Sequence, residues 1–158
     1  INLKKISLVD FVSNLKANLS LFEDMREEKI GLINEINLKD NFYIKIDKKR
    51  FDKALSQLLT NAFEHRKTSV WIELNEKGKQ IMITVADDGA GFDEKSLSDV
   101  NKLFYTDNFG RTSGKGTGMG LFIADSYIAA MGGDLVLENE KGGRARICLD
   151  IEEENYGE

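Results

Sequence analysis

The residue types best suited to chemistry begin where one predicted strand ends. Apolar residues alternate over 81–85, which predicts a strand with one buried face. Asp87 falls on that face, where a carboxylate is costly unless it has a hydrogen-bonding partner. Gly89 and Gly91 follow at once, so the backbone turns there and leaves room for close approach. The stretch indicates a polar anchor in a pocket, and an ordinary Asp-Gly turn at the end of a strand is the alternative.

A second glycine-rich stretch, residues 114–121, leads into an apolar helix. Glycines in this position expose free backbone N–H groups at the positive end of the helix, which suits phosphate. The P-loop pattern does not fit, because it requires glycine where Phe109 stands and serine or threonine where Gly116 stands. The dinucleotide fingerprint does not fit either, since Met119 or Leu121 occupies the place of its last glycine. The stretch is therefore another kind of phosphate site, or it only lets a helix pack closely.

A polar edge on a third predicted element adds two amides and the only histidine. Asp47 is typical of a helix N-cap, and the helix is expected to run to about His65. Its predicted buried stripe consists of Phe51, Ala54, Leu55, Leu58, Leu59, Ala62 and Phe63. Gln57, Asn61, Glu64 and His65 lie along one edge of this stripe, on neighbouring turns. Such an edge meets either a ligand cleft or only water.

The composition restricts the class of protein. The chain has 158 residues, of which 41% are hydrophobic and 31% charged, and this suits one globular domain. The net charge of -5 argues mildly against nucleic acid as the main partner. No apolar run approaches a membrane span, no signal peptide is visible, and no cluster has metal-ligand spacing. Cys148 is the only cysteine, so an internal disulfide is excluded, and we expect it to be packed or half-exposed. Because the chain begins with Ile1 rather than Met, we expect it to be a piece of a longer protein.

Hydrophobic periodicity predicts the elements that hold these residues. In the first third of the chain, helical spacing predicts a helix over 8–25, and alternation predicts a hairpin of strands 30–38 and 42–46 with its turn at 39–41. Further along, we expect a hairpin (70–74 with 80–86), a long binding segment or lid (93–116) and a helix (117–131). Two strands (134–138 and 144–151) and a frayed acidic tail (152–158) follow.

Each of the three features is a weak signal alone. In their order along the chain they are specific together: the helix edge with Asn61, the strand that ends at Asp87, and the segment that leads into the second glycine-rich stretch. Here the sequence resembles the catalytic, ATP-binding domain of sensor histidine kinases, in the superfamily of the gyrase, MutL and heat-shock chaperone ATPases. The resemblance covers about 8–151 of a single domain over 1–158. It rests on residues that resemble the N box, the first glycine box, the lid phenylalanine motif and the second glycine box of the family: 57–62, 87–91, Phe104–Tyr105 and 114–121.

The resemblance implies the Bergerat ATP-binding fold, an α/β (α+β) two-layer sandwich with helices on one face of a mixed, mainly antiparallel sheet. It implies that Asp87 accepts a hydrogen bond from the adenine amino group, and that Asn61, with Gln57, offers an amide oxygen to Mg²⁺. Gly89 and Gly91 would let the base and the lid approach. The ATP-binding residues implied in this way are Asn61, His65, Arg66, Asp87, Gly89, Gly91, Phe104, Tyr105, Lys115, Gly116, Thr117, Gly118, Met119, Gly120 and Leu121.

Several positions depart from the pattern of the family. Gln57 stands where asparagine is common and where the hydrolase branches have a glutamate base, which favours kinase over hydrolase. Glu64–His65 replaces a common Lys-Tyr pair. His65 or Arg66 would therefore have to supply the phosphate contact that the lysine makes. Thr106 replaces an arginine, so Arg111 or Lys115 would have to supply positive charge.

The resemblance implies a kinase domain that passes the γ-phosphoryl group of ATP to a histidine on a separate, upstream dimerisation domain. A response regulator would act downstream, and the fragment would be monomeric, cytoplasmic, and free of nucleic-acid or membrane contacts. His65 is expected to contact phosphate or pack at the helix edge rather than accept the phosphoryl group. The alternatives are an anti-sigma-factor serine kinase, a degenerate binding module without phosphotransfer, and an ATP hydrolase, which Gln57 disfavours.

Overall fold

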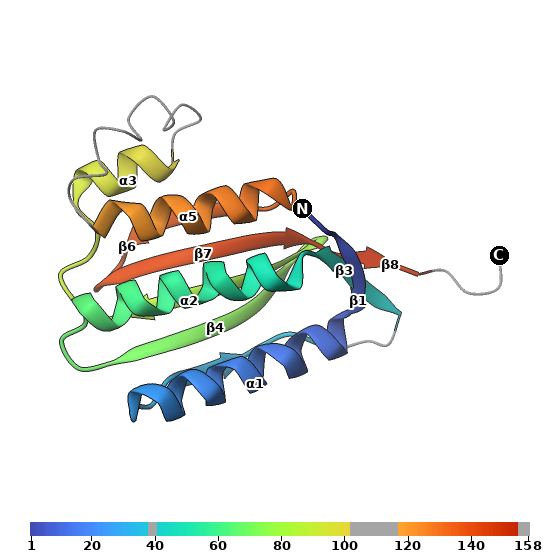
Figure 1. Cartoon of the computed structure of the whole chain (residues 1–158), viewed down its shortest axis with the longest axis horizontal. Coiled ribbons are helices and arrows are strands. Elements are labelled where there is room, and N and C mark those ends of the chain that lie inside the picture. The colour runs from blue at the N-terminus through green and yellow to red at the C-terminus, as the bar shows by residue number, and fades with distance from the viewer. Residues whose placement is uncertain (38–40, 102–116, 155–158) are drawn as a thin grey trace.

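The computed structural model describes residues 1–37, 41–101 and 117–154, which form two layers (Figure 1). Three helices cover one face of a five-stranded sheet, and a small second sheet lies at one end. The elements are β1 (Lys4–Ser7), α1 (Leu8–Arg26), β2 (Gly31–Asn34), β3 (Phe42–Ile46), α2 (Lys48–His65), β4 (Val70–Lys77), β5 (Gln80–Asp87), α3 (Glu94–Asn101), α5 (Thr117–Ala130), β6 (Asp134–Asn139), β7 (Gly143–Asp150) and β8 (Glu152–Glu153).

The large sheet has the strand order β2-β4-β5-β7-β6. Strands β2 and β4 are parallel, and the other neighbours are antiparallel. Helices α1, α2 and α5 lie over the same face (Figure 1). The predicted two-layer sandwich with a mixed, mainly antiparallel sheet is therefore confirmed.

Helix α2 forms where the sequence predicts it. The side chain of Asp47 caps it by accepting from the backbone N–H of Arg50 at 3.2 Å. A hydrogen bond from the backbone of Asn2, followed by the Arg50 guanidinium, lowers the pKa of Asp47 to about 2. All seven residues of the predicted apolar stripe are buried, with at most 5% of any side chain exposed.

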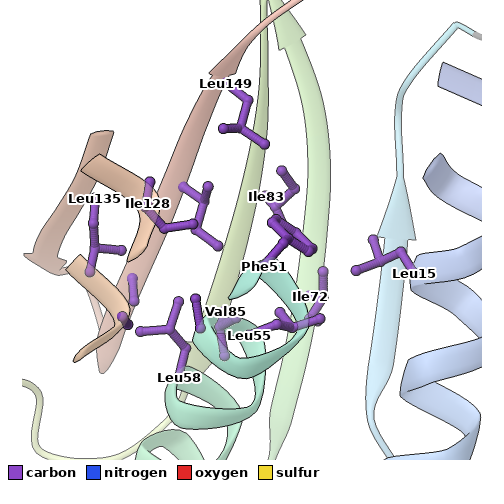
Figure 2. Packing of buried hydrophobic residues seen from close by; sticks show 14 of the residues in the cluster. Leu15, Phe51, Leu55, Leu58, Ile72, Ile83, Val85, Ile128, Leu135 and Leu149 are labelled. Atoms are coloured by element: carbon purple, nitrogen blue, oxygen red, sulfur yellow. The ribbon is translucent and has the colours of Figure 1, made fainter. Parts of the chain in front are cut away.

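The core fills the space between the sheet and the helices (Figure 2). Phe51 packs edge-on against Phe11 of α1, with 5.2 Å between ring centroids. Leu58 faces Val85 of β5, and Ile128 brings α5 into the same cluster. Burying each such side chain contributes about 1.5–3 kcal/mol relative to exposure. This packing fixes α2 and α5 against the sheet, and these are the helices that carry the predicted site residues.

Charged side chains cover the middle of the opposite face of the sheet. Arg144 donates to both carboxylate oxygens of Glu73, at 2.6 and 3.1 Å, and Arg146 pairs with Glu138. Thr84 lies in the same cross-strand row as Glu73 and Arg146 and is 2% exposed. Cys148 is half-buried on β7, as predicted, and burial raises the pKa of its thiol.

The predicted hairpin over 30–46 is wrong. Strand β2 pairs in parallel with β4 at the edge of the large sheet, whereas β3 pairs with β1 and β8 in the small sheet. Alternation identified both strands, but it carries no information about their partners.

Both ends of the chain hold strands that the sequence did not indicate. The acidic tail was expected to be frayed from residue 152, yet β8 pairs with β3, and Glu152 accepts from the Tyr43 hydroxyl at 2.8 Å. Strand β1 was missed because it has only one apolar residue, Ile6. None of the described helices is long and apolar enough to cross a membrane.

Candidate functional site

A cavity of about 110 Å³ lies where α2, the loop after β5, α3, α5 and β7 meet. The structure brings together residues that are far apart in the sequence and were predicted as site residues. These are Asn61 and His65 from α2, Asp87 and Gly91 from the end of β5 and its loop, and Leu121 from α5. Four further lining residues were not predicted: Phe92, Asp93, Ser96 and Gly143.

Asp87 is the buried acid of this cavity. Its side chain is 4% exposed, and its Oδ1 accepts a hydrogen bond from the backbone N–H of Gly89 at 2.8 Å. Burial raises the pKa of the carboxyl, while hydrogen bonds from the backbone of Gly89 and Gly143 act in the opposite direction. The predicted inward carboxylate at the end of the strand is therefore present. In chemical terms it is an acceptor for a hydrogen-bond donor that enters the cavity.

The glycines around Asp87 are required by the packing of the chain on itself. A Cβ on Gly89 would stand 1.9 Å from the carbonyl oxygen of His65, at the end of α2. Gly91 has a φ of +91°, and a Cβ there would meet the Asn139 side chain at 2.7 Å. Other parts of the protein therefore approach the backbone closely at these two glycines, as the sequence predicts. Their roles toward a base and a lid stay predictions.

Asp88 joins the loop after β5 to the loop after α2, a role that sequence reasoning missed. Its Oδ1 accepts from the backbone N–H groups of Lys67 and Thr68, each at 2.9 Å, and of Ser69 at 3.1 Å. The Thr68 hydroxyl donates to the other oxygen at 2.5 Å. That hydroxyl and the backbone donors hold the pKa of Asp88 far below its usual range. This contact exists only because the fold brings the two loops together, so no local sequence pattern predicts it.

Helices α2 and α5 bring the two predicted motifs on them into contact. A Cβ on Gly120 would stand 2.7 Å from Oε1 of Gln57, so the amide of Gln57 lies against α5 rather than in the cavity. Met119 is half-buried near the start of α5. Thr117 and Gly118 belong to the first turn of that helix.

Arg66 is not brought to the cavity. Its guanidinium pairs with Glu28 at 2.5 Å and donates to the carbonyl oxygen of Phe63. His65, the residue before it, is exposed and lines the cavity. Of the two predicted substitutes for a phosphate contact, only His65 is therefore near Asp87. The other predicted site residues, Phe104, Tyr105, Lys115 and Gly116, lie outside the described residues, as does Arg111.

Residues 46–155 match the family model described as "Histidine kinase-, DNA gyrase B-, and HSP90-like ATPase". The chain belongs to this family, and the prediction from the four motifs is confirmed. Its relatives among curated proteins are sensor histidine kinases, so the serine-kinase alternative is not favoured.

Two relatives illustrate the similarity. The chain is 29% identical over 155 residues to the sensor histidine kinase WalK of Bacillus subtilis (strain 168), covering 95% of this chain and 25% of WalK. It is 33% identical over 108 residues to the sensor protein SrrB of Staphylococcus aureus (strain NCTC 8325 / PS 47), covering 66% of this chain and 18% of SrrB. The chain thus spans about a quarter or less of these relatives.

Solved structures agree on the fold. The catalytic domain of the histidine kinase ThkA superposes with a TM-score of 0.69 at 22% identity, covering 95% of this chain and 96% of that one. Full-length ShkA, solved in complex with AMPPNP, has a TM-score of 0.67 at 19% identity, covering 97% of this chain and 32% of ShkA.

Proposed function

We propose that this domain binds ATP in the Asp87 cavity and transfers its γ-phosphoryl group to a histidine on a separate, upstream dimerisation domain. One observation carries the proposal: a buried carboxylate from the end of β5 shares a cavity with residues of α2 and α5. Membership of the ATPase and kinase family supports ATP as the ligand.

Adenine recognition follows from the chemistry of the Asp87 carboxylate. An ionised carboxylate only accepts hydrogen bonds, so it pairs with the exocyclic amino group of adenine. Guanine has a carbonyl oxygen at the corresponding position, and two acceptors would then face each other in a buried site. The site should therefore favour ATP over GTP.

Asn61 suits the phosphate end of the ligand. Mg²⁺ prefers oxygen ligands and usually keeps water and phosphate oxygens in its shell, so it needs few groups from the protein. The described residues contain no group of three acidic, cysteine or histidine side chains able to hold a metal. Asn61 lines the cavity, and within the described part of the chain no hydrogen bond engages its amide. A bound Mg²⁺ would neutralise phosphate charge, while Asn61 would orient the ion as a single amide ligand.

Gln57 is the second proposed amide ligand for Mg²⁺, but in this structure its side chain lies against Gly120. Its Oε1 faces α5, so its side chain would have to turn toward the phosphates to reach the ion. The backbone of 116–120 would hold those phosphates, with His65 at the rim of the cavity. Transfer then depends on positioning and charge neutralisation rather than on covalent chemistry by the protein.

In the longer protein we place this domain in the cytoplasm, beside the phosphoacceptor domain and upstream of a response regulator. The dimerisation helices of such proteins provide the dimer contacts, so the fragment itself is proposed to be a monomer. The changes at Gln57, Glu64 and Thr106 support one second candidate, a module that binds nucleotide without transferring phosphate.

Phosphotransfer is tested directly by mixing this domain with γ-labelled ATP, Mg²⁺ and a purified phosphoacceptor-histidine domain from a sensor kinase. The kinase proposal predicts acid-labile, base-stable label on that domain, and no label with Asn61→Ala. ATP binding without transfer to any acceptor domain tested, including the protein's own upstream segment, would favour the binding module. Steady release of phosphate without an acceptor would favour a hydrolase.

A further inference from the structure

Asn139 holds the loop after β5 with two hydrogen bonds to one residue. Its Oδ1 accepts from the backbone N–H of Phe92 at 2.8 Å, and its Nδ2 donates to the carbonyl oxygen of Phe92 at 2.9 Å. A side-chain amide offers both an acceptor and a donor, so it pairs with a peptide as a neighbouring strand would. We refer to this arrangement as an asparagine clamp.

A second asparagine clamp of the same form lies further along the same segment. The Nδ2 of Asn101 donates to the carbonyl oxygen of Leu137 at 2.8 Å, and its Oδ1 accepts from the Leu137 N–H at 2.9 Å. Leu137 and Asn139 both belong to β6, which is an edge strand of the large sheet. Segment 92–101, which contains α3, is therefore attached to this edge at both of its ends.

The two clamps differ in their relation to the Asp87 cavity. Phe92 lines the cavity, and so does Gly91, whose missing Cβ would lie 2.7 Å from the Asn139 Oδ1. Asn101 lies at the other end of α3 and does not line that cavity. Asn139 thus fixes a wall of the cavity, whereas Asn101 fixes a part of the same segment away from it.

The turn that follows Asn139 also contacts Asp87 directly. Gly142 has a φ of +135°, and a Cβ on it would stand 1.9 Å from the Asp87 carbonyl oxygen. A Cβ on Gly143 would stand 3.1 Å from Asp87 Oδ2 and 3.2 Å from the Phe92 ring. The end of β6 and its turn to β7 therefore pack against both the acid and the loop beside it.

We propose that Asn139 is a positioning residue for recognition of the base. It holds Gly91 and Phe92 at a fixed distance from Asp87, so the cavity keeps its shape before the nucleotide arrives. This inference rests on the proposed function, because it assigns Asn139 to the same site. Preorganisation of this kind raises affinity, since less order has to be imposed on binding.

The test compares Asn139→Asp with Asn101→Asp as a matched control. Each substitution keeps the size and the acceptor, removes the donor, and places a carboxylate oxygen against a backbone carbonyl. Asn139→Asp is expected to lower the affinity for ATP and for ADP about tenfold and by the same factor, because the clamp acts at the base. Asn101→Asp is expected to keep the wild-type affinities while lowering the melting temperature by a similar amount. Calorimetric titration and thermal melts measure the two effects.

Equal affinities for wild type and Asn139→Asp would overturn the inference, as would an equal loss in both variants. If Asn139→Asp does not fold, Asn139→Ser and Asn101→Ser give the same comparison without placing a carboxylate against a backbone carbonyl. A folded wild-type chain that binds neither nucleotide would overturn the proposed function together with this inference. Wild-type binding that depends on Asp87 but not on Asn139 would overturn this inference alone.

Discussion

The backbone N–H of Gly89 donates to Oδ1 of Asp87 at 2.8 Å, yet burial still raises the pKa of that carboxyl above its ordinary 3.8. The hydrogen bond and the loss of water act in opposite directions, and the loss of water is the larger effect. The acid at the centre of the site is therefore held in a surrounding that penalises its charge.

The pH dependence of stability follows from this raised pKa. The folded state holds the Asp87 proton more tightly than the unfolded chain does, so this group's contribution to the free energy of unfolding rises as pH falls from the raised pKa toward 3.8. ATP affinity should fall over the same range, because the neutral carboxyl is a weaker acceptor. Denaturant unfolding and ATP titration of wild type and Asp87→Asn across this range measure both. Parallel curves for the two proteins would contradict the prediction.

The contribution of Asp88 to stability should change with pH in the opposite direction to that of Asp87. Its pKa in the fold lies below the ordinary 3.8, so its stabilisation is fully present above that value and is lost as pH falls through the lowered pKa. We expect Asp88→Asn to melt at a lower temperature than wild type at neutral pH, because the contacts to Thr68 and its neighbours weaken. The difference should shrink in strong acid. A difference that does not change with pH would mean that packing, not charge, accounts for it.

Gly89 should tolerate no side chain. In Gly89→Ala the new methyl group would meet the His65 carbonyl oxygen at 1.9 Å, and since both are backbone-anchored we expect a loss of at least about 3 kcal/mol in the free energy of unfolding. Gly78→Ala is the control, because its site is open and only its φ of +62° opposes alanine. That variant should lose about 1–2 kcal/mol. Similar losses in chemical unfolding would argue against the close approach of α2 to the loop.

Gly120→Ala separates packing from phosphate binding. The added methyl group would meet only the flexible end of Gln57, and alanine favours a helix by about 1 kcal/mol, so stability should be kept or raised. Affinity for ATP should fall, because Gly120 belongs to the backbone proposed to hold phosphate. Ser126→Ala, an exposed substitution in the same helix, is the control for both measurements. Unchanged ATP affinity in Gly120→Ala would remove Gly120 from the proposed phosphate site.

The sequence predicted the parts of the fold that have strong periodicity. The stripe of α2 from Phe51 to Phe63 and the hairpin of β4 and β5 appear as expected, because each pairs with near neighbours or buries a regular face. The partner of β2 was not predictable from alternation, since a lone edge strand has the same pattern whichever strand it joins. Strand β1 has almost no apolar signal.

The same distinction between local patterns and long-range contacts applies to the residues of the site. Asp87, Asn61 and Leu121 were predicted because each lies in a local motif, and the fold places them around one cavity. The contacts of Asp88 and Asn139 were not predicted, because each joins segments that are distant in the sequence. Single polar residues of this kind look like ordinary loop residues until the backbone groups they bind are known.

Adenine recognition by Asp87 is tested most directly by calorimetric titration of ATP with Mg²⁺ into wild type and Asp87→Asn, with thermal melts to show that both are folded. Asparagine keeps the size of the side chain but turns a donor toward the adenine amino group. We expect binding by wild type and a loss of about 1–3 kcal/mol in the variant, which is an affinity about five- to 150-fold weaker. Equal ATP affinity in the two proteins would contradict the assignment of Asp87 to adenine, and no binding by folded wild type would contradict the nucleotide site itself.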